Sequence, residues 1–226
     1  MVDAQGEPPP PIPAATVVLV RDTDQGVETL MLHRNSKLAF GGMWVFPGGR
    51  VDPEDRVGAA DEQGAATRAA VREAREEAGL ECDPQSLVAL SHWLPPPIAP
   101  KRFATWFFVA PAPSGAVTID GGEIHDSAWM RPGDALQRRD ALEIEVAPPT
   151  WMTLHHLARF PDVAALLADT RQHEPVFYET HMARADDGII ALWAGDAGYE
   201  SGDAEQPGSR HRLWIGAGPW RLERSS

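Results

Sequence analysis

The chain has 226 residues, of which 43% are hydrophobic, so it is long enough to bury a sizeable core. Its 33 acidic and 20 basic residues give a net charge of −13, which disfavours binding to a nucleic-acid backbone. Cys82 is the single cysteine, which excludes an internal disulfide and a cysteine-based zinc cluster. No apolar run approaches the roughly 20 residues of a membrane helix, so we expect a cytoplasmic protein without a membrane partner.

The first part of the chain is expected to form a tail and then a hairpin. Residues 1–13 are rich in proline and are predicted to be a flexible tail. Residues 16–22 and 27–34 are apolar, β-branched runs on either side of a polar turn, which is typical of a β-hairpin. Residues 41–55 contain four glycines and two prolines, a composition that favours a short strand leading into a structured loop.

A helix is predicted from about Asp61 to Gly79, with glycine suited to its C-terminal end. Its apolar stripe consists of Ala70, Val71, Ala74 and Ala78.

A second stripe on this helix, roughly 100° wide, carries Glu73, Glu76 and Glu77. If the stripe is exposed, it is an ordinary solvated helix face in which Arg72 pairs with Glu76. If it is partly buried, each like-charge pair costs roughly 3 kcal/mol at an effective dielectric near 20 and a separation of about 6 Å. A partly buried stripe would therefore need a cation.

The rest of the chain predicts an α/β fold with a mixed sheet flanked by helices. Strands are expected at residues 87–94, 103–110 and 123–130. Helices with proline at or near their beginnings are expected at residues 132–142, 149–160 and 161–169. Further strand-like segments follow at residues 173–182, 188–195 and 210–224.

The glycine-rich loop and the helix together resemble the Nudix hydrolase box, in which Gly, five residues, Glu and seven residues precede Arg-Glu-aliphatic-any-Glu-Glu-any-Gly-aliphatic. Residues 72–80, REAREEAGL, match every charged position and the glycine, although Ala74 is smaller than the usual aliphatic residue. Five residues separate Gly49 from Asp55, which stands where the box has Glu, and sixteen residues separate Asp55 from Arg72. The box thus carries an insertion of nine residues, which we expect to form a surface excursion that leaves the helix face intact.

This resemblance implies a Nudix-type α/β/α sandwich with additional C-terminal helices and strands, and a metal-dependent pyrophosphohydrolase. The metal would be held by Glu73, Glu76 and Glu77 with the backbone carbonyl of Gly49. Arg72 would orient Glu73 through an ion pair. Hard oxygen donors favour Mg²⁺ or Mn²⁺. The implied reaction is attack by water at phosphorus in a nucleoside diphosphate linked to another moiety.

Residues 15–150 are similar to the branch of the Nudix family that includes the peroxisomal coenzyme A diphosphatase. The similarity rests on residues 31–49, on the insertion in the box and on residues 92–110. It implies cleavage of the pyrophosphate of CoA or acyl-CoA, giving 3′,5′-ADP and a phosphopantetheine product.

Two carboxylates are candidates for the general base. Glu73 is one, and Glu123, at the start of the predicted strand 123–130, is the other, unless it is simply an exposed strand carboxylate. Strand alternation would place His125 on the same face as Glu123, although a lone histidine is more often structural.

An acidic protein that binds an anion needs local positive charge. The candidates for substrate binding are Arg34, Arg50, Lys101 and Arg102, each with an ordinary surface role as the alternative. Trp93 and Phe103 could stack on a base, but packing is the better explanation for either. His155 and His156 are adjacent on a predicted helix, so they face different directions and do not form a metal pair.

The expected organisation is a Nudix hydrolase domain over residues 14–148 and an extension, residues 149–226, packed on its core. The strands after residue 172 could complete the sheet, cover the substrate cleft or form a homodimer interface. The alternative to an enzyme is a catalytically silent Nudix-like module that senses a nucleotide or CoA derivative, although a pure binder has no need for the acid cluster. An RNA-processing enzyme is disfavoured by the acidic balance and the lack of a basic stripe.

Overall fold

The computed structural model describes residues 10–35, 41–186 and 188–225. The chain forms two compact units. The larger unit contains residues 14–92 and 105–176. The smaller unit contains residues 93–104, the C-terminal part of the chain from Phe177 and the N-terminal end of the chain. A family-domain boundary at residue 148 stays a prediction, and residues 1–9 of the predicted tail lie outside the described residues.

The predicted hairpin is confirmed. Strand β1 (Ile12–Thr23) pairs antiparallel with β2 (Gly26–Arg34), and the turn between them closes at the Thr23–Gly26 pair. Gly26 has a φ of 105°, which favours glycine at this position. β1 begins at Ile12, inside the predicted tail, because the Ile12 N–H donates to the Arg102 carbonyl at 2.7 Å.

The large sheet has eight strands in the order β3-β2-β1-β6-β5-β8, with β4 paired to β1 and β7 paired to β2. Its remaining strands are β3 (Trp44–Val45), β4 (Gly48–Arg50), β5 (Val88–Leu94), β6 (Phe103–Pro111), β7 (Ile124–Met130) and β8 (Val176–Glu179). The strands and the structured loop expected before residue 131 are thus present, and β8 gives the segment after residue 172 a place in the sheet.

Helix α2 (Glu62–Ala78) confirms the helix predicted between Asp61 and Gly79. It begins where the Asp61 side chain accepts a hydrogen bond from the Gly64 N–H at 2.7 Å. It ends at Gly79, which has the left-handed φ of 67°. Between Asp55 and Arg72 only residues 57–61 form a loop, because a short helix α1 (Pro53–Arg56) ends at Arg56 and α2 already begins at Glu62.

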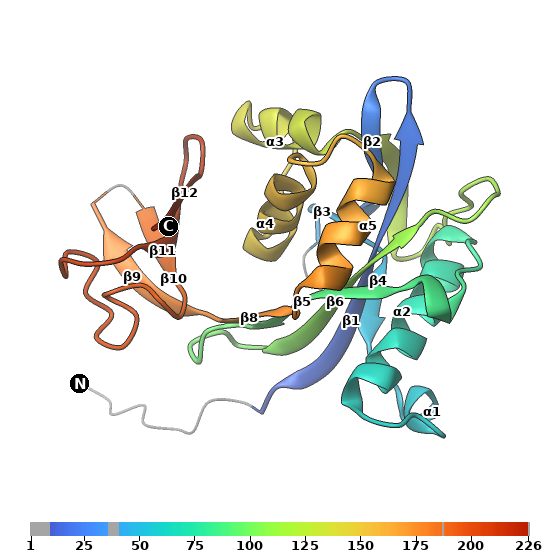
Figure 1. The fold of residues 1–226 in the computed structure, drawn as a ribbon, viewed down its shortest axis with the longest axis horizontal. Coiled ribbons are helices and arrows are strands. Elements are labelled where there is room, and N and C mark those ends of the chain that lie inside the picture. The colour runs from blue at the N-terminus through green and yellow to red at the C-terminus, as the bar shows by residue number, and fades with distance from the viewer. Residues whose placement is uncertain (1–9, 36–40, 187, 226) are drawn as a thin grey trace. The chain divides into compact units, whose positions relative to one another are not determined.

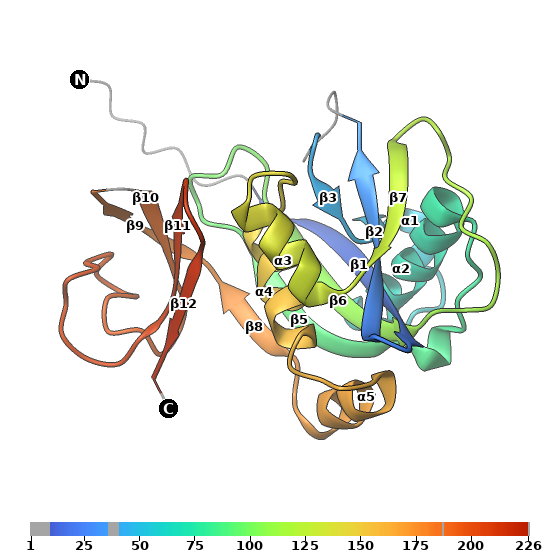
Figure 2. The same cartoon turned by 90° about the horizontal axis from the view of Figure 1, so that it is seen from above.

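α2 covers one face of the large sheet with small side chains. Val17 and Leu19 of β1 and Leu30 and Leu32 of β2 share one buried cluster with the helix alanines Ala66, Ala69, Ala70, Ala74 and Ala78. Alanine lets the helix axis approach the sheet closely, so the position of α2 is fixed by close packing. Figures 1 and 2 show α3 (Pro132–Asp140) and α4 (Pro148–Leu157) on the opposite side of the sheet from α2.

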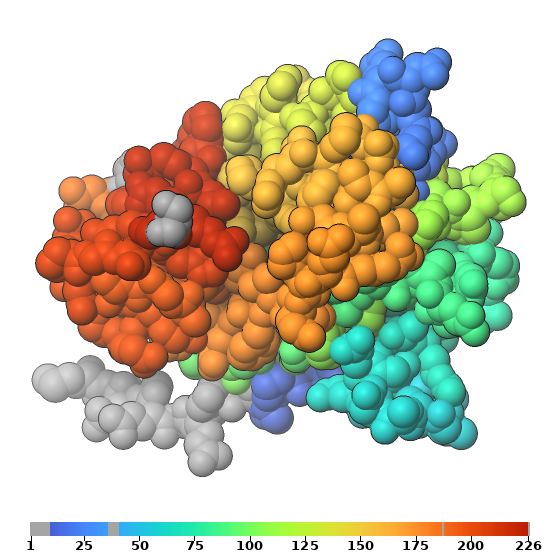
Figure 3. Space-filling view, in the orientation of Figure 1, coloured from blue at the N-terminus to red at the C-terminus, as the bar shows by residue number. Residues whose placement is uncertain are grey.

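Helix α5 (Val163–Gln172) completes the larger unit and is visible over much of its face in Figure 3. Its first turn is held by the hairpin, because the Val163 N–H donates to Asp22 Oδ1 at 2.9 Å. A 3₁₀ turn, η1 (Pro84–Ser86), leads from α2 towards β5.

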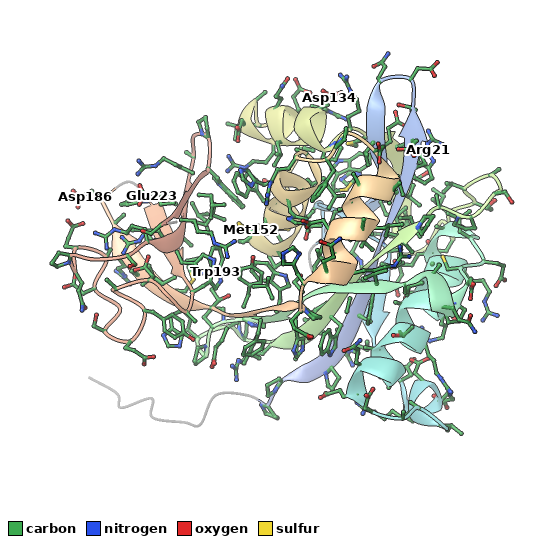
Figure 4. All side chains as sticks on the ribbon, viewed as in Figure 1. Arg21, Asp134, Met152, Asp186, Trp193 and Glu223 are labelled. Carbon is green, nitrogen blue, oxygen red and sulfur yellow. The ribbon has the colours of Figure 1, made fainter. Side chains whose placement is uncertain are left out.

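The smaller unit contains a four-stranded antiparallel sheet in the order β12-β11-β10-β9. Its strands are β9 (His181–Ala185), β10 (Gly188–Leu192), β11 (His211–Gly216) and β12 (Arg221–Arg224). Trp193, labelled in Figure 4, is buried and donates its indole N–H to Thr180 Oγ1 at 3.1 Å. Across the described residues, no helix is long and apolar enough to cross a bilayer.

Candidate metal and catalytic site

The glycine turn of the box lies directly against α2. β4 is paired to β1 through Thr16 and Gly48, and the Gly48 N–H donates to Glu77 Oε2 at 2.9 Å. A Cβ at Gly49 would overlap the Glu73 carboxylate. Glycine is therefore required at position 49 if the Glu73 carboxylate is to rest on the backbone of β4.

Arg72 is the centre of an ion-pair network on the exposed side of α2. Its Nη1 atom donates to Glu73 Oε1 at 2.8 Å and to Glu76 Oε2 at 2.9 Å, and its Nη2 atom donates to the Arg50 carbonyl at 2.9 Å. Partial burial opposes the charged form, but the hydrogen bonds to carboxylates hold the pKa of Arg72 above its ordinary value. The ion pair expected between Arg72 and Glu73 is thus present.

Asp55 completes this network, and sequence reasoning gave it no role. Its carboxylate is 6% exposed and accepts from Arg72 Nη2 at 3.0 Å and from Arg72 Nε at 3.3 Å. The Asp52 N–H also donates to Asp55 Oδ2 at 2.9 Å. The signal was its place six residues after Gly49, where the box has glutamate. α1 brings the shorter aspartate to Arg72 despite the insertion.

A second ion-pair group joins the buried end of the acidic stripe to β7. Glu77 is 4% exposed, and its Oε1 atom accepts from Arg34 Nη2 at 3.2 Å. The same Nη2 atom donates to Glu123 Oε2 at 2.7 Å. Burial raises the pKa of Glu77 to about 7, and the hydrogen bond from Gly48 and the charge of Arg34 oppose this rise. Burial also raises the pKa of Glu73, against the lowering effect of Arg72.

The donors at this site suit a hard divalent ion. Within the described part of the chain, no three His, Cys, Asp or Glu side chains converge as a ready metal cage. Mg²⁺, however, is usually bound by one or two carboxylates together with waters and substrate phosphate oxygens, so a closed cage is not required. Glu73 lies against Gly49, and the half-exposed Glu76 can turn towards the same edge. Glu73, Glu76 and the Gly49 carbonyl therefore have the oxygen donors that Mg²⁺ or Mn²⁺ prefers. Both oxygens of the buried Glu77 already accept hydrogen bonds, from the Gly48 N–H and from Arg34, so Glu77 can bind the ion only if it gives up one of them.

The other predicted cations differ in position. Arg50 lies at the site through its carbonyl, and its side chain is exposed. Lys101 is exposed in the smaller unit. Arg102, also in that unit, is 7% exposed and donates its Nε–H to the Pro95 carbonyl at 3.1 Å. A buried guanidinium that holds the proline-rich loop is poorly placed to bind an anion, so the predicted substrate contact of Arg102 is not supported.

The expectation that His125 shares a face with Glu123 was wrong. The strand β7 begins only at Ile124, and its register with β2 shifts between His33 and Arg34. The His125 ring lies 6.1 Å from the His33 ring, whereas the Glu123 carboxylate accepts from Arg34, which also contacts Glu77 of α2.

Trp93, His155 and His156 each pack against another aromatic ring. Trp93 is buried and stacks on Tyr178, with 3.9 Å between ring centroids. His155 stacks on Trp151, and His156 packs edge-on against Phe160, so the two histidines do point in different directions.

Comparisons with known proteins agree with this geometry. The family model described as the NUDIX domain matches residues 10–150. The human protein named 8-oxo-dGDP phosphatase NUDT18 is 25% identical over 174 residues, which are 74% of this chain and 45% of that protein. The chain therefore spans less than half the length of this relative.

Solved structures show the same fold. A NUDIX hydrolase from Alicyclobacillus acidocaldarius superimposes with a TM-score of 0.65 at 23% identity, covering 70% of this chain and 96% of that one. The NUDIX domain of Shewanella oneidensis NrtR, solved with ADP ribose, gives a TM-score of 0.50 at 18% identity, covering 70% and 97%. The family match over most of the chain, with a glutamate-bearing helix packed on a glycine turn, places this protein in the NUDIX family.

Proposed function

We propose that the chain hydrolyses the pyrophosphate of a nucleoside diphosphate linked to another moiety, with Mg²⁺ or Mn²⁺ as cofactor and CoA or acyl-CoA as a candidate substrate. The single observation that carries this proposal is the joint placement of Glu73, Glu76 and Arg72 beside the Gly48–Gly49 turn. A protein that only binds its ligand has no need for Glu73, Glu76 and Glu77 on one helix stripe, because like charges at this spacing repel one another.

In the proposed reaction, a water oxygen forms a bond to phosphorus and the bridging P–O bond breaks, so the leaving phosphate takes the electron pair. The bound divalent ion would neutralise the pyrophosphate and lower the pKa of the attacking water. Arg72 holds Glu73 at the glycine turn, and Glu77 ties that turn to α2 through Gly48.

The water proton is accepted by a carboxylate, and two remain candidates. Glu73 lies at the turn itself, and Glu123 lies beside Arg34 at the edge of β7. In the described structure, Arg34 contacts Glu77 and Glu123 at once, so contact between Arg34 and a substrate phosphate requires it to leave one of them. Arg50, whose carbonyl accepts from Arg72, is the proposed exposed cation for the substrate.

A substrate screen tests this function directly. The purified chain is incubated with CoA, acyl-CoA, NADH, ADP-ribose, dinucleoside polyphosphates and 8-oxo-dGDP, first with Mg²⁺ and then with Mn²⁺. Mass spectrometry of the products identifies both the substrate and the bond that breaks. We expect turnover only with a divalent ion, and a rate loss of about 100-fold or more in Glu76→Gln, the scale seen when groups that stabilise developing charge are removed.

The matched control is Glu81→Gln, an exposed glutamate just beyond the end of α2. It should keep the parental rate, and both variants should keep the parental melting temperature, because Glu76 is half exposed. Equal activity of the parent and Glu76→Gln would overturn the metal assignment. Stoichiometric binding of a ligand without turnover would identify a sensor instead of an enzyme.

A further inference from the structure

The loop that leads into β7 is built around one aspartate. Asp120 accepts hydrogen bonds from the Glu123 N–H at 2.9 Å, through Oδ2, and from the Ile124 N–H at 3.0 Å, through Oδ1. Gly121, with a φ of 71°, allows the chain to turn back over the Asp120 carboxylate. The backbone of Glu123 is therefore held from within its own loop.

A second anchor comes from the end of β2. The Asn35 N–H donates to the Glu123 carbonyl at 2.8 Å, and Asn35 Nδ2 donates to the Gly122 carbonyl at 3.2 Å. Both backbone polar groups of Glu123 are thus hydrogen-bonded, one to Asp120 and one to Asn35.

The Glu123 side chain is too exposed for packing to hold it in one position. It is 54% exposed, and its ion pair with Arg34, at 2.7 Å, is of a kind that contributes little when one partner is in water. An exposed glutamate also loses rotamer freedom when it is held in one place. The precision of its position must therefore come from the backbone, and the Asp120 carboxylate supplies two of the hydrogen bonds that define that backbone.

The charge state of Asp120 suits this role. Slight desolvation acts to raise the pKa of its carboxyl, but the N–H groups of Glu123, Ile124 and Gly122 and the charge of Arg34 lower it below the ordinary value. The carboxylate stays ionised, and ionised acceptors form the stronger hydrogen bonds.

We propose that Asp120 is a positioning residue for the reaction, which holds Glu123 at the Arg34 and Glu77 edge of the site without contacting the substrate itself. This inference rests on the proposed function, in which Glu123 is one of the two candidate bases. It assigns a purpose to the Asp-Gly-Gly-Glu segment, residues 120–123, that the family box does not include.

A double-mutant cycle tests the inference. Asp120→Ala should lower kcat by about tenfold, the smaller end of the range for groups that orient a site residue, and should change KM by less than about twofold. Glu123→Gln should lower kcat by more. In the Glu123→Gln background, Asp120→Ala should cause no further loss, because its effect acts through Glu123. Asp120→Asn keeps one acceptor oxygen and should restore most of the rate.

The control is Asp126→Ala. Asp126 is exposed on β7, and its Oδ1 atom accepts the Ser127 N–H at 2.8 Å, so it resembles Asp120 in solvent contact and bonding. It should keep the parental kcat in both backgrounds. Melting temperatures of all variants report whether they fold.

Three results would overturn the inference while the proposed function stands: Asp120→Ala at the parental rate, Glu123→Gln at the parental rate, or equal losses from Asp120→Ala in both backgrounds. The last result would mean that Asp120 supports the fold generally. A parent chain that hydrolyses none of the compounds in the screen would overturn the proposed function, and this inference with it.

Discussion

Asp55 is the most buried of the carboxylates that pair with Arg72. It is buried, and it binds both Arg72 and the backbone of Asp52. Removal of one partner from a buried ion pair leaves a desolvated charge, so Asp55→Ala should lower the free energy of unfolding by about 2 kcal/mol. It should also reduce hydrolysis, because Arg72 loses one of the contacts that hold its guanidinium beside Glu73 and Glu76. Denaturant unfolding and initial rates measure the two effects.

The control for Asp55 is Glu54→Ala, one residue earlier on α1 and exposed. Its stability should stay within about 0.5 kcal/mol of the parent. If Asp55→Ala matches Glu54→Ala in both stability and rate, Asp55 has no role at Arg72.

At the scale of residues, the sequence predicted ion pairs within one helix better than it predicted which side chains are buried. Arg72 and Glu76 are four residues apart on one helix, so their ion pair follows from local geometry. The pair of Arg72 with Glu73 was expected only from the family resemblance. The partner of Arg34 could not be found in this way, because Glu77 lies 43 residues away and Glu123 lies 89 residues away. The burial of Arg102 depends on a loop fold that the sequence pattern does not encode.

At the scale of elements, the contact between β4 and α2 positions the residues of the site. A methyl group at Gly48 would meet the backbone of Ala15 and Thr16, which cannot move without separating β4 from β1. A methyl group at Gly49 would meet the end of the flexible Glu73 side chain. We therefore expect Gly48→Ala to destabilise the fold by about 1–3 kcal/mol, as overpacking does, and Gly49→Ala to destabilise it less.

Gly49→Ala should lose activity although it is the less destabilised of these two variants. Gly49→Ala displaces the Glu73 carboxylate, so it should lose most of the hydrolysis while it remains folded at the assay temperature. Gly133→Ala on α3, where a methyl group meets nothing within 4 Å, should be neutral in both measurements. A Gly49→Ala variant with the parental rate would show that contact between Glu73 and β4 is not needed for catalysis.

Helices and strands were predicted correctly where the spacing of the hydrophobic residues agrees with the residues typical of helix and strand ends. The β1–β2 hairpin and α2, with aspartate at its start and glycine at its end, are of this kind. α1 was missed because four residues are too few to show a helical period. The face of His125 was predicted wrongly because a register shift breaks the strand alternation, and such a shift leaves no signal in one sequence.

At the scale of the whole molecule, the smaller unit has its own stabilising ion pair. Arg212 donates to both oxygens of Asp196, at 2.6 Å and 2.7 Å, and both side chains are almost fully buried. Burial acts to raise the pKa of Asp196, but hydrogen bonds from Arg212 and from the His211 and Gly198 N–H groups lower it to about 2. This ion pair therefore joins β11 to the segment that follows β10.

This pair predicts a pH dependence of stability. A carboxyl with a lowered folded-state pKa stabilises the fold at any pH above its unfolded value of about 3.9, and that stabilisation, on the order of 2 kcal/mol, is lost as the pH falls. The loss should end near the folded value of about 2. Urea unfolding followed by tryptophan fluorescence should show this decline between about pH 4 and pH 2 in the parent.

Asp196→Asn should be less stable than the parent at neutral pH, and its curve should be flatter in the same acid window. Asp203→Asn, an exposed aspartate of the same unit, should follow the parent. Parallel curves for the parent and Asp196→Asn would show that Asp196 does not titrate with unfolding.

The most direct test of the account is a titration with Mn²⁺, followed by the loss of the electron paramagnetic resonance signal of the free ion. The parent and Glu81→Gln should bind Mn²⁺ with equal affinity, and Glu76→Gln should bind it at least about tenfold more weakly, the effect expected at a metal site. Equal Mn²⁺ affinity in all three proteins would contradict the claim that the acidic edge of α2 beside Gly49 holds a divalent ion.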